Sequence, residues 1–292
     1  MKLRLLICAV CTCILFSSFS SAEERVNKSV TNMYEHASEA SSVVSQAKYA
    51  EKVTVLKEDS EWLFVRSNDQ YEGWILRDNV AQMDDYFEES QMITTLSRET
   101  LIYSSDSVGK HKPLLKLPFG VELTAMDDPN KWGSRWIRIR LLDGGVAWVQ
   151  RGDIHIGSLE LDMTEMVKLS KLFIGVPYTW GGRSSLGFDC SGFVQEMYKT
   201  IGVHLPRDSG PQSRWSGLVD VPKSSLKPGD LLFFGNQKVS HVGLFLQENE
   251  EGLLFINATV SDNNGSNAPY LQISNLNSDF WSGLFIEAKR LK

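Results

Sequence analysis

The chain of 292 residues is 42% hydrophobic and 23% charged, values that are typical of a folded globular protein and exclude wholesale disorder and fibrous repeats. This length is enough for about two or three domains. The net charge is −6 and the 30 basic residues are scattered rather than clustered, which argues against a protein that binds nucleic acid through its phosphates.

Residues 1–22 have the pattern of a cleavable secretory signal. Lys2 and Arg4 form a positive start, Leu5 to Phe16 is an apolar run, and small residues end at Ala22. An apolar run of this length is too short to span a bilayer. We therefore expect an exported protein of the periplasm or cell envelope, without stable membrane insertion once the signal is removed. The alternative is an uncleaved amphipathic or core segment.

Three of the four cysteines, Cys8, Cys11 and Cys13, lie in this segment. They lie inside the apolar run and not at its end, which disfavours a lipoprotein anchor. Only Cys190 remains after removal, so we expect no internal disulfide and no zinc site built from several cysteines. Cys190 is then either a buried structural residue or a reactive thiol.

The segment after the signal contains one pattern twice, with an offset of 74 residues. In each copy one tryptophan lies in a short alternating run and another follows Gly or Ala. The matched tryptophans are Trp62 and Trp74 in the first copy and Trp136 and Trp148 in the second. Short strands at such spacing predict two small all-β barrels, which we place at residues 26–84 and 88–157. The pattern resembles bacterial SH3 domains.

From residue 158 the pattern changes to helices followed by strands. Asp162 and Glu165 have the spacing of a capping box, and a helix with one apolar face follows. The residues of that face are Met166, Leu169, Leu172 and Phe173. A second helix follows Cys190 and ends at Gly202. Apolar runs predict strands at 231–234, 241–246, 253–258 and near 283–290. This order predicts an α+β domain over residues 158–292.

Cys190 lies in the sequence Asp-Cys-Ser-Gly, at the predicted start of the second helix. A thiol at an exposed helix start is close to unpaired amide groups and the positive end of the helix dipole, which lower its pKa and favour the thiolate. The same amides are suited to hold an oxyanion during acyl transfer. A structural cysteine is more usual in the middle of a helix, so the sequence favours a nucleophile.

A cysteine nucleophile needs a base, and His241 opens the apolar strand His-Val-Gly-Leu-Phe-Leu. With the following loop centred on Asn249, antiparallel pairing places Asn257 directly opposite His241. In that position Asn257 orients the imidazole. The alternative is a turn or strand-edge role for Asn257.

Three motifs, in this order, resemble those of the NlpC/p60 family of cell-wall cysteine peptidases over residues 160–290: Asp-Cys-Ser-Gly-Phe, Lys-Pro-Gly-Asp-Leu-Leu-Phe-Phe and Ser-His-Val-Gly-Leu-Phe-Leu. The resemblance implies a papain-like α+β fold with Cys190 as nucleophile, His241 as general base and Asn257 as the orienting residue. Many family members have histidine at the third position. The chain departs from them there, although a Cys-His-Asn set is mechanistically competent.

The segments around Tyr178 and Arg207 resemble the YkfC-like branch of this family, which carries bacterial SH3 domains ahead of the peptidase domain. That branch cleaves muropeptides between γ-D-glutamate and a diamino acid and favours an L-alanine with a free amine. The resemblance implies that Asp208 contacts the amine and that Tyr71 reaches in from the first barrel. It further implies a pocket lined by Tyr178, Trp180, Asp189, Ser191, Arg207 and Ser209. The branch also uses a glutamate of the first barrel, for which Glu35 and Glu39 are candidates.

These residues also have structural interpretations. Tyr178 and Trp180 suit an apolar core, and Tyr71 suits a plain strand position. Arg207 and Asp208 suit an exposed ion pair of little energetic weight.

The motifs together predict an exported cysteine endopeptidase that acts on peptidoglycan or muropeptides, foremost at the γ-D-glutamyl–diaminopimelate bond. No metal or organic cofactor is expected. Two alternatives stay open. One is an N-acetylmuramoyl-L-alanine amidase with the same cysteine and histidine, and the other is a non-catalytic wall-binding protein.

Overall fold

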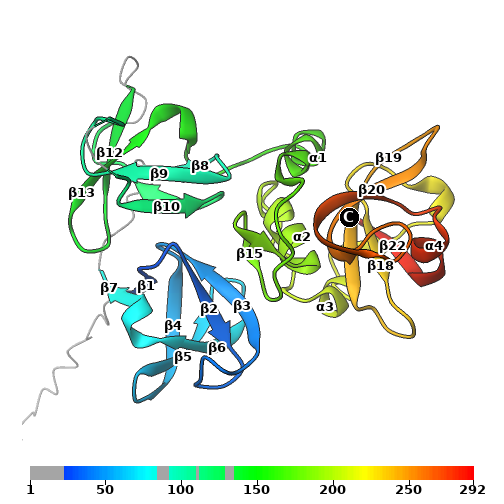
Figure 1. Cartoon of the computed structure of the whole chain (residues 1–292), viewed down its shortest axis with the longest axis horizontal. Helices are drawn as coiled ribbons and strands as arrows, with labels where there is room; N and C mark the ends of the chain where they lie inside the picture. The colour runs from blue at the N-terminus through cyan, green and yellow to red at the C-terminus, as the bar shows by residue number, and fades with distance from the viewer. Residues whose placement is uncertain (1–22, 84–91, 110–111, 129–134) are drawn as a thin grey trace, which may run out of the picture.

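The computed structural model describes residues 23–83, 92–109, 112–128 and 135–292, so the predicted signal segment 1–22 lies outside the described residues. Two β units precede a larger domain of helices and strands (Figure 1). In these ranges no helix is both long and apolar enough to cross a membrane.

The first β unit is a seven-stranded sheet with the order β3-β2-β6-β5-β4-β1-β7. Its strands are β1 (Glu24–Val26), β2 (Val30–Tyr34), β3 (Val43–Lys48), β4 (Lys52–Asp59), β5 (Trp62–Ser67), β6 (Glu72–Leu76) and β7 (Val80–Gln82). Alternate side chains point inward, as the period of two in a strand requires, and form a small core that includes Met33, Val65 and Ile75.

The second β unit has two smaller sheets, with the orders β10-β9-β13-β12 and β11-β8-β14. Its strands are β8 (Met92–Thr95), β9 (Glu99–Tyr103), β10 (Leu115–Pro118), β11 (Glu122–Thr124), β12 (Trp136–Arg140), β13 (Val146–Gln150) and β14 (Ile154–Ile156). Tyr49 and Ala50 of the first unit belong to the apolar core of the second, and the Tyr49 hydroxyl accepts a hydrogen bond from the Leu142 amide at 2.9 Å. The two units therefore share part of one core.

The sequence repeat is a structural repeat. β5, β6 and β7 begin 74 residues before β12, β13 and β14. Trp62 packs edge-on against Tyr34 with ring centroids 5.6 Å apart, and Trp136 packs in the same way against Tyr103 at 5.4 Å. The domain limits drawn from the sequence stay a prediction.

The larger domain has an antiparallel six-stranded sheet with the order β17-β22-β18-β19-β20-β21. Its strands are β17 (Leu218–Asp220), β18 (Leu231–Phe234), β19 (His241–Asn249), β20 (Gly252–Ser261), β21 (Asn267–Asn275) and β22 (Phe285–Leu291). The other elements are α1 (Met163–Ser170), the hairpin β15 (Arg183–Ser184) and β16 (Gly187–Phe188), α2 (Cys190–Lys199), α3 (Ser209–Ser213) and α4 (Asp279–Leu284). The predicted α+β class, with two β units ahead of it, is confirmed.

Two details of the predicted elements are wrong. The capping box of Asp162 and Glu165 forms, but α1 ends at Ser170 in a 3-10 turn, and Leu172 of the predicted apolar face is 62% exposed. The strand β21 follows β20 and was not expected, because its alternating polar residues and Pro269 do not form an apolar run.

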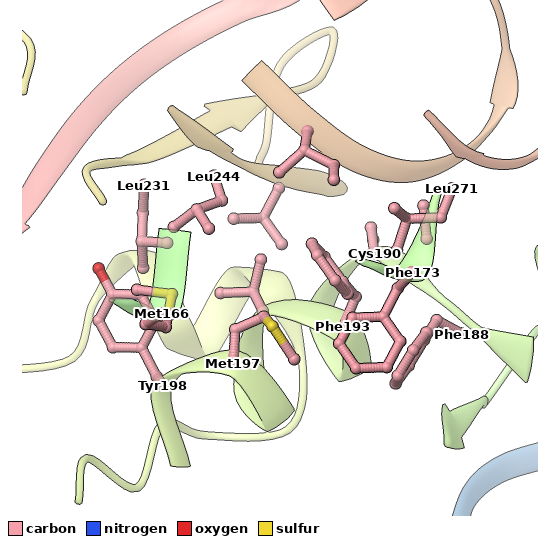
Figure 2. Packing of buried hydrophobic residues seen from close by; sticks show 14 of the residues in the cluster. Met166, Phe173, Phe188, Cys190, Phe193, Met197, Tyr198, Leu231, Leu244 and Leu271 are labelled. Atoms are coloured by element: carbon pink, nitrogen blue, oxygen red, sulfur yellow. The ribbon is translucent and has the colours of Figure 1, made fainter. Parts of the chain in front are cut away.

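The apolar side of α2 packs against the sheet. Figure 2 shows Phe193 and Met197 of this helix among the buried side chains, with Cys190 in the same cluster. Phe188 links the helix to the preceding segment, since its ring lies edge-on to Phe193 at 5.5 Å and to Phe173 at 5.7 Å. This packing holds the N-terminal end of α2 inside the domain.

A group of buried charges, which we call the Arg183 cluster, joins the first β unit to the larger domain. It consists of Lys48, Glu51, Asp69, Arg183 and Glu196. Arg183 lies 3.2 Å from Glu196 and 3.3 Å from Glu51, and Lys48 lies 2.6 Å from Glu196. Burial opposes the ionisation of Glu196, but Lys48 and Arg183 outweigh it and lower its pKa.

Replacing the central cation should destabilise the whole assembly. Arg183→Ala leaves the surrounding carboxylates without their shared partner, and breaking a buried pair in this way costs about 3–5 kcal/mol. Arg66→Ala is the matched control, because Arg66 pairs with Glu72 on the exposed surface of the same unit, where a pair contributes under about 1 kcal/mol. Chemical denaturation measures both, and equal losses in the two variants contradict the prediction.

Candidate active site

Cys190 is the first residue of α2, and the residue before it caps the helix. Oδ1 of Asp189 accepts a hydrogen bond from the Gly192 amide at 2.7 Å, which decides where the helix begins. Glycine is needed at position 192 because a Cβ there would lie 2.2 Å from the carbonyl oxygen of Gly182. The cap and the close packing of two glycines therefore place the thiol.

The sulfur is enclosed by the domain. Cys190 is 7% exposed and belongs to the main apolar core, so the predicted exposed helix start is wrong. Cys190 and Val242 pack in the same core, and the backbone amides of Val242 and Ser191 favour the thiolate. Val242 directly follows His241 on β19, so this contact brings the thiol to the strand that carries the predicted base.

His241 and Asn257 meet between β19 and β20. Nε2 of His241 lies 2.9 Å from Oδ1 of Asn257. The predicted register is wrong by two residues, because Leu244 pairs with Ile256, which places Asn257 opposite Gly243. A shift by two keeps both side chains on one face, so they meet as diagonal neighbours.

The position of the turn separates the observed register from the predicted one. Asn249 pairs with Gly252, so the loop is centred between Glu250 and Glu251 and not on Asn249, and a bulge between Phe245 and Gln247 recovers one residue of that offset. Gly243 leaves space opposite Asn257, since a Cβ there would lie 3.3 Å from the Cβ of Asn257 and 2.5 Å from the Phe255 ring. The amide and the imidazole use this space.

The amide of Asn257 has one orientation that satisfies its neighbours. Its Nδ2 donates to the hydroxyl of Ser274 at 3.0 Å and to the carbonyl of Gln272 at 3.4 Å. A carbonyl only accepts, so Oδ1 is the atom that faces His241, and Nε2 of the neutral imidazole carries the proton. The lone pair on Nδ1 is then the one that takes a proton from a thiol.

Burial shifts both reacting groups toward their neutral forms. It raises the pKa of Cys190 to about 12, and the carboxylate of Asp189 adds to this shift. It lowers the pKa of His241 to about 4, against the hydrogen bond that the ring donates to Asn257. The predicted low thiol pKa is wrong for this state, because desolvation outweighs the helix dipole and the two amides. A neutral thiol and a neutral imidazole are the forms between which a proton can move during attack.

Arg207 is buried and pairs with Asp189. Its two terminal nitrogens lie 3.0 and 2.5 Å from the two carboxylate oxygens. The same guanidinium donates to Ser191 Oγ at 3.0 Å and to Ser45 Oγ, on β3 of the first unit, at 3.1 Å. Arg207 is 3% exposed, so the interpretation as an exposed pair with Asp208 is wrong. Arg207 holds the residue that caps the cysteine helix.

Tyr71 and Asp208 meet at the boundary between the first unit and the larger domain. The Tyr71 hydroxyl donates to Oδ2 of Asp208 at 3.2 Å. The turn before Tyr71 is held by Asp69, which accepts from the Tyr71 amide at 3.2 Å and from Gln195 Nε2 at 3.1 Å. Burial raises the pKa of Tyr71 to about 12, and the charge of Asp208 adds to it, so the phenol stays a donor.

The remaining predicted pocket residues are placed as follows. Tyr178 packs against the main core, and burial raises the pKa of its phenol, with the charges of Cys190 and Asp189 as further causes. Trp180 is 69% exposed, which excludes a core role for it. Ser209 is buried and begins α3, directly after Asp208.

The two candidate glutamates are not brought to Asp208 by any contact in the described residues. Glu39 lines a cavity of about 390 Å³ together with Thr179 and Gly187 of the larger domain. The backbone of Glu35 pairs with Ser42 within its own hairpin. The predicted glutamate contact therefore stays a prediction.

The sequence did not predict the residues that support the site residues through hydrogen bonds. Ser45 supports Arg207, and Asp69 and Gln195 support the turn of Tyr71. Nothing in the local pattern of Ser45 distinguishes it from other strand residues. A signal existed for Arg183, since a charged residue directly after Trp-Gly-Gly and before an apolar helix is unusual.

A buried cysteine at a capped helix start, with a histidine and asparagine on the facing strands, is the arrangement of papain-like cysteine peptidases. The model of the NlpC/P60 family matches residues 175–290, and that of the bacterial SH3 domain matches residues 29–81. The larger domain therefore contains an NlpC/P60 domain, and the first unit contains a bacterial SH3 domain.

Curated relatives agree with this assignment. A γ-D-glutamyl-L-lysine dipeptidyl-peptidase of Bacillus cereus is 29% identical over 225 residues, which cover 71% of this chain and 66%, or just under two thirds, of that protein. A probable peptidoglycan endopeptidase of Bacillus subtilis is 34% identical over 133 residues, which cover 44% of this chain and 35% of that protein. The crystal structure of an NlpC/P60 family protein from Bacillus cereus has a TM-score of 0.78 at 21% identity and covers 92% of this chain and 99% of its own. The last comparison shows that the fold extends over both β units and the larger domain.

Replacing Asn257 should weaken catalysis less than replacing His241. Asn257→Ala removes the partner of Nε2 but leaves the base, whereas His241→Ala removes a general base, which contributes about 10²–10⁴-fold. Asn257→His, which restores the more usual family residue, should retain substantial activity. Steady-state kinetics on a γ-D-glutamyl peptide measure the series, and wild-type turnover in Asn257→Ala shows that another residue orients the imidazole.

Proposed function

We propose that this protein is a cysteine endopeptidase that hydrolyses the stem peptides of peptidoglycan between γ-D-glutamate and the diamino acid that follows it. The observation that carries the proposal is the meeting of Cys190, at the start of α2, with the strand pair that holds His241 and Asn257. The activities for which the two curated relatives are named support the class of substrate and the bond.

The geometry supports a two-step acyl transfer. The Cys190 proton moves to Nδ1 of His241 while the sulfur forms a bond to the amide carbonyl carbon. The leaving amine takes this proton as the carbon–nitrogen bond breaks, which leaves a thioester on Cys190. Water then attacks the thioester and gives its proton to His241, which returns it to the sulfur as the acid product leaves.

Removing the sulfur should abolish hydrolysis and leave the fold intact. Cys190→Ala and Cys190→Ser remove the nucleophile, and deleting one small buried group costs about 1 kcal/mol in stability. Val167→Ala is the matched control, because Val167 lies in the same core and has no part in the chemistry. Product formation is followed by mass spectrometry on defined muropeptides. Turnover by Cys190→Ala sinks the mechanism, whichever bond is cut.

The same experiment separates the two enzymatic candidates. An endopeptidase releases L-Ala-γ-D-Glu or a muramoyl form of it together with a peptide that begins with the diamino acid. An amidase instead releases the whole stem peptide from muramic acid. Substrates that contain lysine or diaminopimelate at the third position identify the diamino acid.

We also propose that the protein is exported and meets its substrate in the cell envelope. The support is the positive start, short apolar run and small residues of segment 1–22. Peptidoglycan and muropeptides are the partners that follow from this location and activity.

The substrate end is the second element of the proposal. The carboxylate of Asp208, with the Tyr71 phenol 3.2 Å away, suits an ammonium group at the N-terminus of the substrate. We infer that the enzyme prefers stem peptides whose L-alanine has a free amine over the same peptides linked to muramic acid. Tyr71 comes from the SH3 domain, so this domain takes part in substrate selection.

Weakening the contact with the substrate amine should reduce the preference for free-amine peptides over muramoyl-linked peptides. A charge-assisted hydrogen bond contributes about 1.5–3 kcal/mol, or roughly 10–150-fold in binding. Tyr71→Phe and Asp208→Asn should therefore raise KM for the free-amine peptide and leave the muramoyl-linked peptide almost unchanged. Tyr103→Phe, in the second β unit, is the matched control. Equal rates of the wild type on both peptides remove the selectivity claim and leave the peptidase proposal standing.

A further inference from the structure

His241 is held by a second contact that the reaction scheme does not use. One face of its imidazole stacks on the indole of Trp281, with ring centroids 5.3 Å apart and an angle of 26° between the planes. Phe234 lies 5.8 Å away at 50°. The ring is therefore held by Asn257 at its edge and by Trp281 on its face.

Trp281 is fixed by its surroundings and has little freedom to follow the imidazole. It lies on α4, whose N-terminus is capped by Ser278, and it is 3% exposed. Phe234, Phe255 and Phe280 pack edge-on around the indole at 5.1, 5.3 and 4.9 Å. In Figure 1 this helix lies beside β18 and β22, and Trp281 shares a core cluster with Phe234 of β18 and Ala288 of β22.

The indole nitrogen contributes nothing to this packing. Nε1 of Trp281 is buried and has no hydrogen-bond partner among the described residues. An unpaired buried donor destabilises a fold, and phenylalanine avoids that cost in an apolar cluster. The larger area of the indole explains why tryptophan occupies this position, because the indole covers one face of the His241 imidazole.

Resting on the proposed peptidase function, we propose that Trp281 is a positioning residue of the reaction. Its indole keeps the imidazole in the plane where Nε2 reaches Asn257, so that Nδ1 stays available to the Cys190 thiol. It also keeps water from that face of His241. Trp281 acts through its contact with the base.

The groups around His241 determine how its pKa changes when Trp281 is replaced. Phe234, Asn257 and Trp281 carry no charge, and on the α2 side the facing groups are Cys190 and the carboxylate of Asp189. Burial is the largest cause of the lowered His241 pKa. Opening the Trp281 face to water therefore moves that pKa up, toward the ordinary value of a histidine.

The experiment compares Trp281→Leu, Trp281→Phe and the matched control Phe280→Leu, in which the lost ring packs on the same indole and has no ring contact with His241. We expect Trp281→Leu to lower kcat by about 10- to 100-fold, with KM changed by less than about threefold. We expect its acid limb of activity to move up by about one pH unit. Phe280→Leu loses stability and keeps both the kcat and the acid limb of the wild type.

Trp281→Phe provides the test if Trp281→Leu does not fold. It keeps a ring against the imidazole, so kcat stays within about threefold of wild type while the smaller ring moves the acid limb upward. An unchanged acid limb in this variant overturns the proposal. So does a loss of kcat in Phe280→Leu as large as that in Trp281→Leu.

Nuclear magnetic resonance of ¹⁵N-labelled histidines gives a readout that needs no substrate. We expect the His241 signal, identified by its absence in His241→Ala, to show the proton on Nε2 in the wild type and a mixture of tautomers in Trp281→Leu. An unchanged tautomer in Trp281→Leu overturns the positioning role. Absence of turnover in the wild type on every muropeptide instead overturns the proposed function and leaves this measurement valid.

Discussion

The ion pair between Asp189 and Arg207 is the contact on which the position of the nucleophile depends. The Asp189 carboxylate caps α2, so it decides at which residue the helix begins and where the sulfur lies. A buried carboxylate without a partner is costly, and the two-pronged guanidinium both offsets that cost and fixes the carboxylate plane. Because Arg207 also bonds Ser45, the alignment of the helix is tied to the SH3 domain.

The SH3 domain thus borders the site, and polar contacts attach it to the larger domain. Two sets of buried contacts connect it to the larger domain: the Arg183 cluster below α2 and the Ser45–Arg207 bond at its start. Buried ionic contacts of this kind contribute little net stability over an apolar interface, but they are directional and tolerate no sliding. An apolar interface allows small shifts, whereas Tyr71 can meet Asp208 in only one arrangement of the domains.

Much of the fold could be predicted from local pattern, because the information lies within a few residues. The capping box at Asp162, the 74-residue repeat and the strand starting at His241 all have this property. The predicted register that pairs His241 with Asn257 is wrong, since the turn between β19 and β20 lies beyond Asn249 and neither that turn nor the bulge beyond Phe245 has a clear signature in the sequence. The error is an even number of residues, so the predicted and observed registers place the same side chains on the same face of the sheet.

Contacts that join distant parts of the chain could not be predicted in this way. The bond from Ser45 to Arg207 and the stacking of Trp281 on His241 connect residues far apart in sequence, and no spacing rule links them. The thiol pKa was predicted in the wrong direction for a related reason. Helix position is readable from sequence, but the depth of burial of Cys190 depends on β19 and β20 closing over it.

The depth of Cys190 has a consequence for its durability. Peroxides, disulfides and alkylating agents react with thiolates, and Cys190 is 7% exposed in surroundings that raise its pKa and so disfavour its thiolate. Burial therefore protects this cysteine from oxidation without a disulfide partner. Selective inhibitors face the same barrier, because an electrophile must reach the buried sulfur of Cys190, and we expect general thiol reagents to react slowly with it.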